Sequence, residues 1–139
     1  MKNLIVLFAC ILSFQFLSAQ EAAVYYSISA KVPNVQQEGG KVIFSLYDKD
    51  TFMKKPITSL VVNIENKTAS ATFTEVPAGT YAILVLHDKN ENNQMDFADN
   101  GMPKESYGVS NNKMNFGPPT FNDAKFEVSD KDLELEIKF

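Results

Sequence analysis

The alternation of apolar and polar residues at every second position constrains this chain more than any other feature. Tyr26, Ile28 and Ala30 alternate with polar neighbours, and the same period returns in later segments. A period of two places side chains alternately on the two faces of a strand, whereas an amphipathic helix needs a period of about 3.6. No window after residue 22 offers a convincing amphipathic helix. The pattern therefore predicts an all-β protein.

Seven segments carry the strand pattern, and Gly, Pro, Asn and Asp residues separate them. They span residues 26–31, 41–47, 60–64, 69–76, 80–87, 124–128 and 133–139. Short strands without the longer spacing of βαβ units are typical of sandwiches. We predict a single antiparallel β-sandwich of about seven strands that occupies residues 20–139 as one domain.

One predicted strand differs from the others because residues 83–86 are apolar at every position. A strand of this kind is covered on both faces, so we expect it to lie centrally in its sheet. Pro77 and Gly79 form a tight turn just before it. The apolar-Pro-small-Gly-Thr-Tyr order resembles the turn before a central strand in transthyretin-like and carboxypeptidase-regulatory-like sandwiches. The resemblance implies an Ig-like or transthyretin-like architecture.

The first nineteen residues have the layout of a secretory signal peptide. Lys2 supplies a positive start, residues 4–17 are almost uninterruptedly apolar, and Ser18 and Ala19 form a small-residue cleavage end. The apolar run is shorter than a membrane-spanning helix requires, so we expect cleavage and no membrane span afterwards. We do not expect lipid attachment at Cys10, because the apolar run continues beyond it. We expect a periplasmic or secreted protein.

The charge balance excludes one class of partner. The chain has a formal net charge of -4, and all of its cationic residues other than the single histidine are lysines. An acidic chain without arginine lacks the clustered positive charge that nucleic-acid binding needs. Cleavage after Ala19 would also remove the single cysteine, which leaves no residue for disulfide or thiol chemistry.

An Asn- and Asp-rich loop follows the predicted central strand, and we interpret it as a calcium loop. Its oxygen-bearing side chains occupy the first, third, fifth, seventh, ninth and twelfth places of a twelve-residue segment: Asp88, Asn90, Asn92, Gln94, Asp96 and Asp99. Calcium loops place ligands at these positions, because alternate residues of a curling loop turn inward together. Asn93 stands at the sixth place, where glycine is usual, and Asn tolerates the left-handed conformation. The alternative is a plain surface turn, since Asn and Asp form turns without a metal.

His87 has no partner in sequence that indicates nucleophilic catalysis, because the chain contains no GxSxG-type motif. We expect its ring to hydrogen-bond to backbone at the end of the strand. The alternative is an enzyme, or an enzyme accessory, with a cleft formed by His87, Glu105 and Tyr107.

The loop and the segment after it contain a distinctive set of residues. The set reads His87-Asp88-x-Asn90-x-Asn92, Asp96, Gly101-x-Pro103-x-Glu105-x-Tyr107-Gly108-x-Ser110-Asn111 and Pro118-Pro119-x-Phe121-x-x-Ala124-x-Phe126. It resembles the bacterial exported domain-of-unknown-function family 2141, from about Tyr25 to the end of the chain. The family usually has glycine where this chain has Asn93. The resemblance implies an exported bacterial domain with no assigned activity.

Together these features predict a non-enzymatic binding or interaction module of the cell envelope. A structural Ca²⁺ would order the loop beside the central strand. The long segment after it would then present Tyr107 and its neighbours to an unknown protein or glycan partner.

Overall fold

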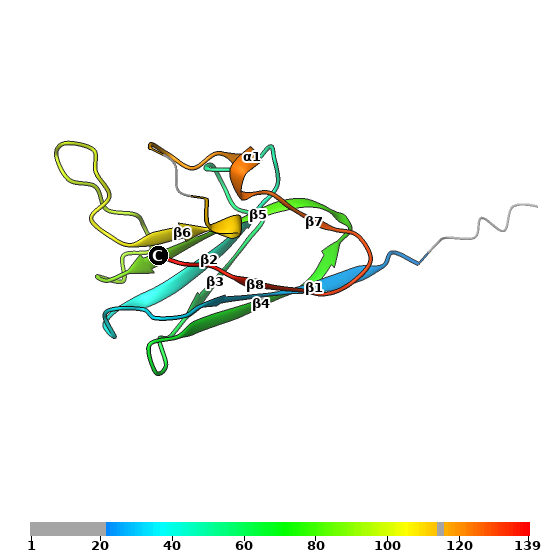
Figure 1. Ribbon diagram of the computed structural model, residues 1–139, viewed down its shortest axis with the longest axis horizontal. Coiled ribbons are helices and arrows are strands. Elements are labelled where there is room, and N and C mark those ends of the chain that lie inside the picture. Colours follow the sequence, from blue (N-terminus) through cyan, green and yellow to red (C-terminus); the bar gives the residue numbers. More distant parts are fainter. Residues whose placement is uncertain (1–21, 114–115) are drawn as a thin grey trace, which may run out of the picture.

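The computed structural model describes residues 22–113 and 116–139, and it contains two β-sheets packed face to face (Figure 1). The predicted signal peptide, residues 1–19, lies outside the described residues. The strands are β1 (Tyr25–Val32), β2 (Lys41–Tyr47), β3 (Thr58–Val62), β4 (Ala69–Pro77), β5 (Gly79–Asp88), β6 (Tyr107–Val109), β7 (Phe126–Val128) and β8 (Leu133–Glu136). The predicted β-sandwich class is confirmed.

The first sheet has the order β4-β1-β8, and the second has the order β3-β2-β5-β6, with β7 paired to the start of β5. Neighbouring strands are antiparallel except β1 and β8, which are parallel. This pair departs from the antiparallel prediction. Residues 129–132 cross from one sheet to the other instead of forming a hairpin, so the direction of β8 is not tied to that of β7. Tyr26 and Ser27 fasten this crossing through hydrogen bonds to the Ser129 carbonyl and the Asp132 carboxylate.

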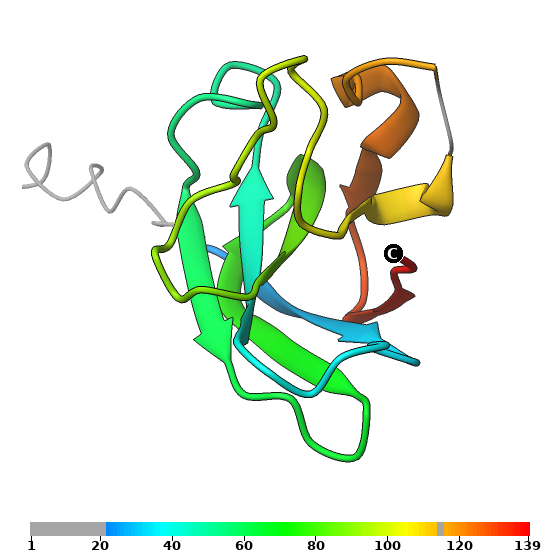
Figure 2. The same cartoon turned by 90° about the vertical axis from the view of Figure 1, so that its left-hand side faces the viewer.

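The apolar strand β5 is central, as its sequence predicts. Ile83 and Val85 are buried in the main core between the two sheets. Ala82 and Leu84 point to the opposite face, where they belong to a second apolar cluster. Ala124 of the short helix α1 (Phe121–Ala124) is part of that cluster, and Figure 2 shows this helix lying over the outer side of the larger sheet. Both faces of β5 are therefore covered.

Several element boundaries differ from the sequence prediction. The strand expected over residues 124–128 begins only at Phe126, because Ala124 belongs to α1. Thr120 caps this helix by accepting a hydrogen bond from the Asp123 N–H, and a four-residue helix is too short to show a period. The three-residue strand β6 and the 3-10 helix η1 (Ser110–Asn112) are also too short to show a period, and the sequence did not predict them. Strand β3 begins and ends two residues earlier than expected, and β8 ends at Glu136.

In the part of the chain that the structure describes, no helix is long and apolar enough to cross a membrane.

The end of the sandwich at Asp88 positions the candidate site. There β5 leads into residues 89–106, which extend beyond the sheets before the chain returns as β6 (Figure 1). The pairing of Lys41 with Asp88 holds the start of this loop against β2.

Candidate functional site

Asp88 is the anchor of the Asn-rich loop. It is the last residue of β5 and is only 1% exposed. Its two carboxylate oxygens accept hydrogen bonds from the backbone N–H groups of Asn92, at 3.1 Å, and Asn93, at 2.7 Å. The first residue of the predicted calcium loop thus binds the backbone of the fifth and sixth residues, which folds the loop back onto the end of the strand.

Asn93 takes the left-handed backbone conformation that the loop requires at its sixth place. Its φ is +61°, and Glu91 has a φ of +58° two residues earlier. Asn adopts this region more readily than other side-chain-bearing residues. The expectation that Asn93 allows the sharp turn is confirmed, and the loop does not need the glycine usual at this place.

Asp96 is hydrogen-bonded to two other predicted ligands, Asn90 and Asn92. Its carboxylate accepts hydrogen bonds from the side-chain amides of Asn90, at 2.7 Å, and Asn92, at 3.1 and 3.2 Å. The amide oxygens of the same two residues accept backbone N–H groups of Asn92 and Gln94, at 3.2 and 2.9 Å. Asp88, Asn90, Asn92 and Asp96 therefore form one hydrogen-bonded group.

The other two predicted ligands are not part of this group. The side chain of Gln94 is exposed, and the residue joins the network through its backbone N–H. Asp99 is exposed and lies in a tight turn closed by a 2.8 Å hydrogen bond from the Gly101 N–H to the Ala98 carbonyl. Asp99 has no hydrogen bond or ion pair with the other predicted ligands in the described residues.

Glu105 is the residue of this loop that the twelve-residue spacing missed. It is 7% exposed, and its carboxylate accepts hydrogen bonds from the backbone N–H groups of Lys89, at 2.8 Å, and Asp96, at 3.3 Å. Glu105 thereby links the second and ninth residues of the loop, although it lies outside the twelve-residue segment. The one signal available in sequence is an acidic residue just before a returning strand, and it does not say which way the side chain turns.

The loop is rich in oxygen atoms, but carboxylates alone do not form a metal cluster. No group of three or more His, Cys, Asp or Glu side chains suited to a metal ion occurs within residues 22–113 and 116–139. A cation here would depend on amide and carbonyl oxygens as well as on Asp88 and Asp96, as calcium sites commonly do. Residues 88–99 hold four acidic residues and one lysine, so the local field favours a cation.

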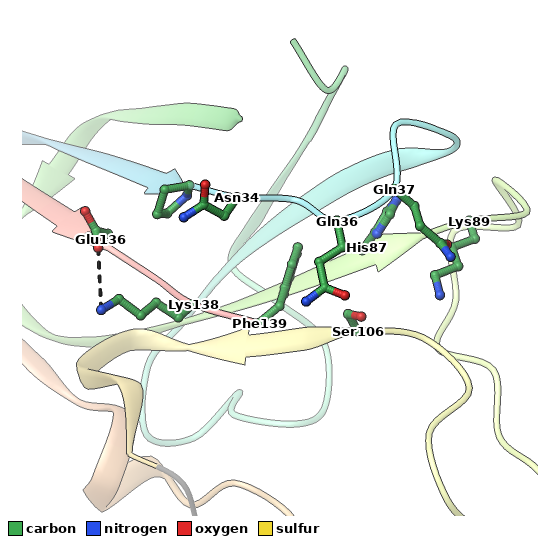
Figure 3. Close-up of a pocket in the computed structure, with 10 residues that line it drawn as sticks. Asn34, Gln36, Gln37, His87, Lys89, Ser106, Glu136, Lys138 and Phe139 are labelled. Carbon is green, nitrogen blue, oxygen red and sulfur yellow. Dashed lines mark ion pairs between the residues drawn. The ribbon is translucent and has the colours of Figure 1, made fainter. Parts of the chain in front are cut away.

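A cavity of about 410 Å³ lies beside the loop, at the same end of the sandwich (Figure 3). His87 is one of its lining residues. The His87 Nε2 atom is 2.7 Å from the Gly39 carbonyl oxygen, and the ring stacks on Phe139 with a centroid distance of 6.0 Å. The expected hydrogen bond from His87 to backbone is confirmed. Glu105 and Tyr107 do not line this cavity, so the structure does not bring them together with His87 in one cleft.

The family model described as "Uncharacterized protein conserved in bacteria (DUF2141)" matches residues 30–136. This chain belongs to the DUF2141 family. The match spans the Asn-rich loop, Glu105 and nearly all of the sandwich, and it confirms the family resemblance drawn from the sequence. No curated protein and no solved structure matches the chain. The transthyretin-like or Ig-like description of this DUF2141 sandwich therefore stays a prediction.

A separate polar turn of this DUF2141 chain has a clear electrostatic consequence. One carboxylate oxygen of Asp48 accepts hydrogen bonds from the Thr51 N–H and hydroxyl, each at 2.9 Å, and from the Asp50 N–H at 3.0 Å. These hydrogen bonds, above all the one from the Thr51 backbone, lower the pKa of Asp48 because they favour the charged form. The turn lies between β2 and β3 and contributes nothing to the Asn-rich loop.

Proposed function

We propose that this DUF2141 chain is an exported, non-enzymatic binding module whose loop at residues 88–99 takes up a structural Ca²⁺. The observation that carries the proposal is the Asp88 carboxylate, which binds the backbone N–H groups of Asn92 and Asn93 while Asn93 holds a φ of +61°. A loop that turns at its sixth residue and gathers the side chains of its first, third, fifth and ninth residues has the form of a calcium loop.

The polar contacts around Asp96 suggest how the loop would receive an ion. Two amide N–H groups, from Asn90 and Asn92, now offset the negative charge of this carboxylate. A cation would replace them, and the two amides would turn so that their oxygens face the ion. Ca²⁺ suits this arrangement better than Mg²⁺, because it accepts six to eight oxygens in flexible geometry. The ligands would be Asp88, Asn90, Asn92 and Asp96, completed by the backbone at Gln94.

The proposed location rests on the sequence of the first nineteen residues, which favours export to the periplasm or beyond. Outside the cytoplasm Ca²⁺ is available to weak sites, so a loop of modest affinity would still be filled. The ion would fix residues 89–106 against the sandwich. A fixed loop would in turn present Tyr107 and its neighbours to a protein or glycan partner.

Isothermal titration with CaCl₂ tests the ion site, and the loop offers a matched pair of variants. Asp96→Asn and Asp99→Asn remove the same charge from the same loop, but only Asp96 belongs to the hydrogen-bonded group. We expect the unaltered chain to bind Ca²⁺, Asp96→Asn to weaken binding by about tenfold or more, and Asp99→Asn to change it little. Absence of heat beyond dilution at millimolar Ca²⁺ would overturn the proposal, as would equal losses in the two variants.

A further inference from the structure

The cavity beside the loop has walls from four segments that are distant in the chain. Its lining residues are Pro33, Asn34, Gln36, Gln37, His87, Lys89, Ser106, Glu136, Lys138 and Phe139. Figure 3 shows the two glutamines reaching in from the connection between β1 and β2, and Phe139 from the segment after β8. Its volume of about 410 Å³ lies within the range of small-molecule binding sites.

Two glycines allow the walls of this cavity to pack closely. A Cβ atom on Gly40 would lie 2.3 Å from the Asp88 carbonyl oxygen, and one on Gly108 would lie 2.3 Å from the Lys138 carbonyl oxygen. Both distances are far below van der Waals contact, so neither wall can hold its position with a larger residue there. The first contact fixes the glutamine-bearing connection to the end of β5, and the second fixes the final segment to β6.

The cavity lining is rich in polar groups that the protein itself does not use. The side-chain amides of Asn34, Gln36 and Gln37 are exposed and make no hydrogen bond within the described residues. Among the charged lining residues, Lys138 is 3.8 Å from Glu136, so these two offset each other, and Lys89 remains as one cation without an ion pair in the described residues. The lining thus offers amide donors and acceptors together with a single uncompensated positive charge, rather than a strong charge of one sign.

An aromatic ring completes the lining. Phe139 is 38% exposed although its ring stacks on the imidazole of His87, with an angle of 16° between the ring planes. The stacking holds the phenyl ring in place while it remains accessible from the cavity. Pro33 and Phe139 are the apolar members of the lining, so the cavity has no deep apolar subsite for a lipid or an aliphatic side chain.

We propose that this cavity binds a neutral saccharide. Each sugar hydroxyl both donates and accepts hydrogen bonds, and a primary amide offers the same pair of functions from one side chain. The apolar C–H face of a pyranose ring packs on an aromatic ring, which here is Phe139. The proposal names the ligand class of the proposed binding module, and it does not depend on calcium, because the ion loop contributes no proposed ligand residue to the cavity.

The test is an NMR titration of the protein, expressed as residues 1–139, with methyl glycosides of glucose, galactose, mannose and N-acetylglucosamine as probes. At least one probe should cause saturable shifts of the Gln36 and Gln37 side-chain amide signals. Phe139→Ala should weaken that binding by about tenfold, which corresponds to about 1.4 kcal/mol. Phe116→Ala is the matched control, because its side chain is fully exposed and lies outside the cavity lining, and it should leave affinity unchanged.

A double variant, Gln36→Ala with Gln37→Ala, provides a second check that leaves Phe139 and its stacking intact, and it too should lose affinity. Saturable binding of none of the four glycosides would overturn the proposal. An affinity of the Phe139→Ala variant equal to that of the unaltered chain would also overturn it. Saturable shifts with triglycine and none with sugars would overturn it as well and would assign the cavity to peptides. Calcium binding without saccharide binding would contradict the cavity assignment alone, and saccharide binding without calcium binding would contradict the ion loop alone.

Discussion

Replacement of Gly40 by alanine should destabilise the fold far more than replacement of the other glycines in turns. Gly40 has a φ of +81°, and an added Cβ would lie 2.3 Å from the Asp88 carbonyl oxygen and 2.7 Å from the Lys89 Cα. Both neighbours are backbone atoms at the end of β5, where Asp88 pairs with Lys41. The clash therefore cannot be relieved by turning a flexible side chain.

Two other glycines allow the cost of the positive φ to be separated from the cost of the steric clash at Gly40. Gly101 has a φ of +79° but nothing within 4 Å of the added Cβ, and Gly39 has open space without a positive φ. The left-handed conformation costs a residue with a Cβ about 1–2 kcal/mol, so Gly101→Ala should lose about that amount. Gly40→Ala carries the same cost plus about 1–3 kcal/mol for overpacking. We expect about 2–5 kcal/mol in total for Gly40→Ala, and little change for Gly39→Ala.

Urea denaturation followed by far-UV circular dichroism and tyrosine fluorescence measures these differences, since the chain has five tyrosines and no tryptophan. With a slope of about 1–3 kcal/mol per molar urea, the additional cost of about 1–3 kcal/mol should place the unfolding midpoint of Gly40→Ala about 0.3–3 M below that of Gly101→Ala. Equal midpoints for these two variants would refute the reasoning. They would mean that backbone conformation, and not the close approach to Asp88, sets the need for glycine.

Three further predictions concern other parts of the chain. Mass spectrometry of the exported protein should find Gln20 as its first residue, and an intact leader would contradict the predicted cleavage. Ser110→Ala should lower the free energy of unfolding by about 1–3 kcal/mol in a urea titration, because the buried hydroxyl accepts a hydrogen bond from the Ile83 N–H. Thr51→Val should raise the pKa of Asp48 in an NMR titration, since it removes one of the hydrogen bonds that lower it. The stability that this lowered pKa contributes is present above the ordinary carboxyl pKa and is lost as the pH falls through the folded-state value. Thr51→Val should therefore lower the free energy of unfolding near neutral pH, and the difference from the unaltered chain should shrink as the pH falls through the folded-state pKa.

Part of the conformation of the Asn-rich loop was predictable, because the relevant geometry is local. Asp88 and Asn93 lie within six positions of one another, so the spacing predicted a loop that turns at its sixth residue. It did not predict that the Asp88 carboxylate accepts the backbone N–H groups of Asn92 and Asn93. Asp99 has the right spacing as well, but it lies in the exposed turn at residues 98–101. Spacing cannot reveal that a second turn has begun, because turn formation there depends on the backbone at Gly101, whose φ is +79°.

Glu105 and the cavity were not predictable, because both depend on contacts between distant segments. The sequence suggested a cleft shared by Glu105, His87 and Tyr107, whereas in the folded chain Glu105 turns toward the backbone of Lys89. His87 turns the other way and contacts the Gly39 carbonyl, 48 positions earlier. The residue opposite His87 is Ser106, whose carbonyl accepts the His87 N–H, and Glu105 and Tyr107 flank it. Neighbouring positions of an extended segment face opposite sides of the sheet, so these two side chains do not share a cavity with His87.

The sequence by itself determined seven of the eight strands of the described residues, that β5 is buried on both faces, and that the loop after it turns at Asn93. Each of these follows from the period of apolar residues or from the backbone preference of a single residue, and such properties act over a few positions. Only the tertiary structure decided that β8 runs parallel to β1, that Glu105 closes the loop, and that Gly40 and Gly108 bring the cavity walls together. These contacts join segments far apart in the chain, and their geometry depends on how the two sheets pack.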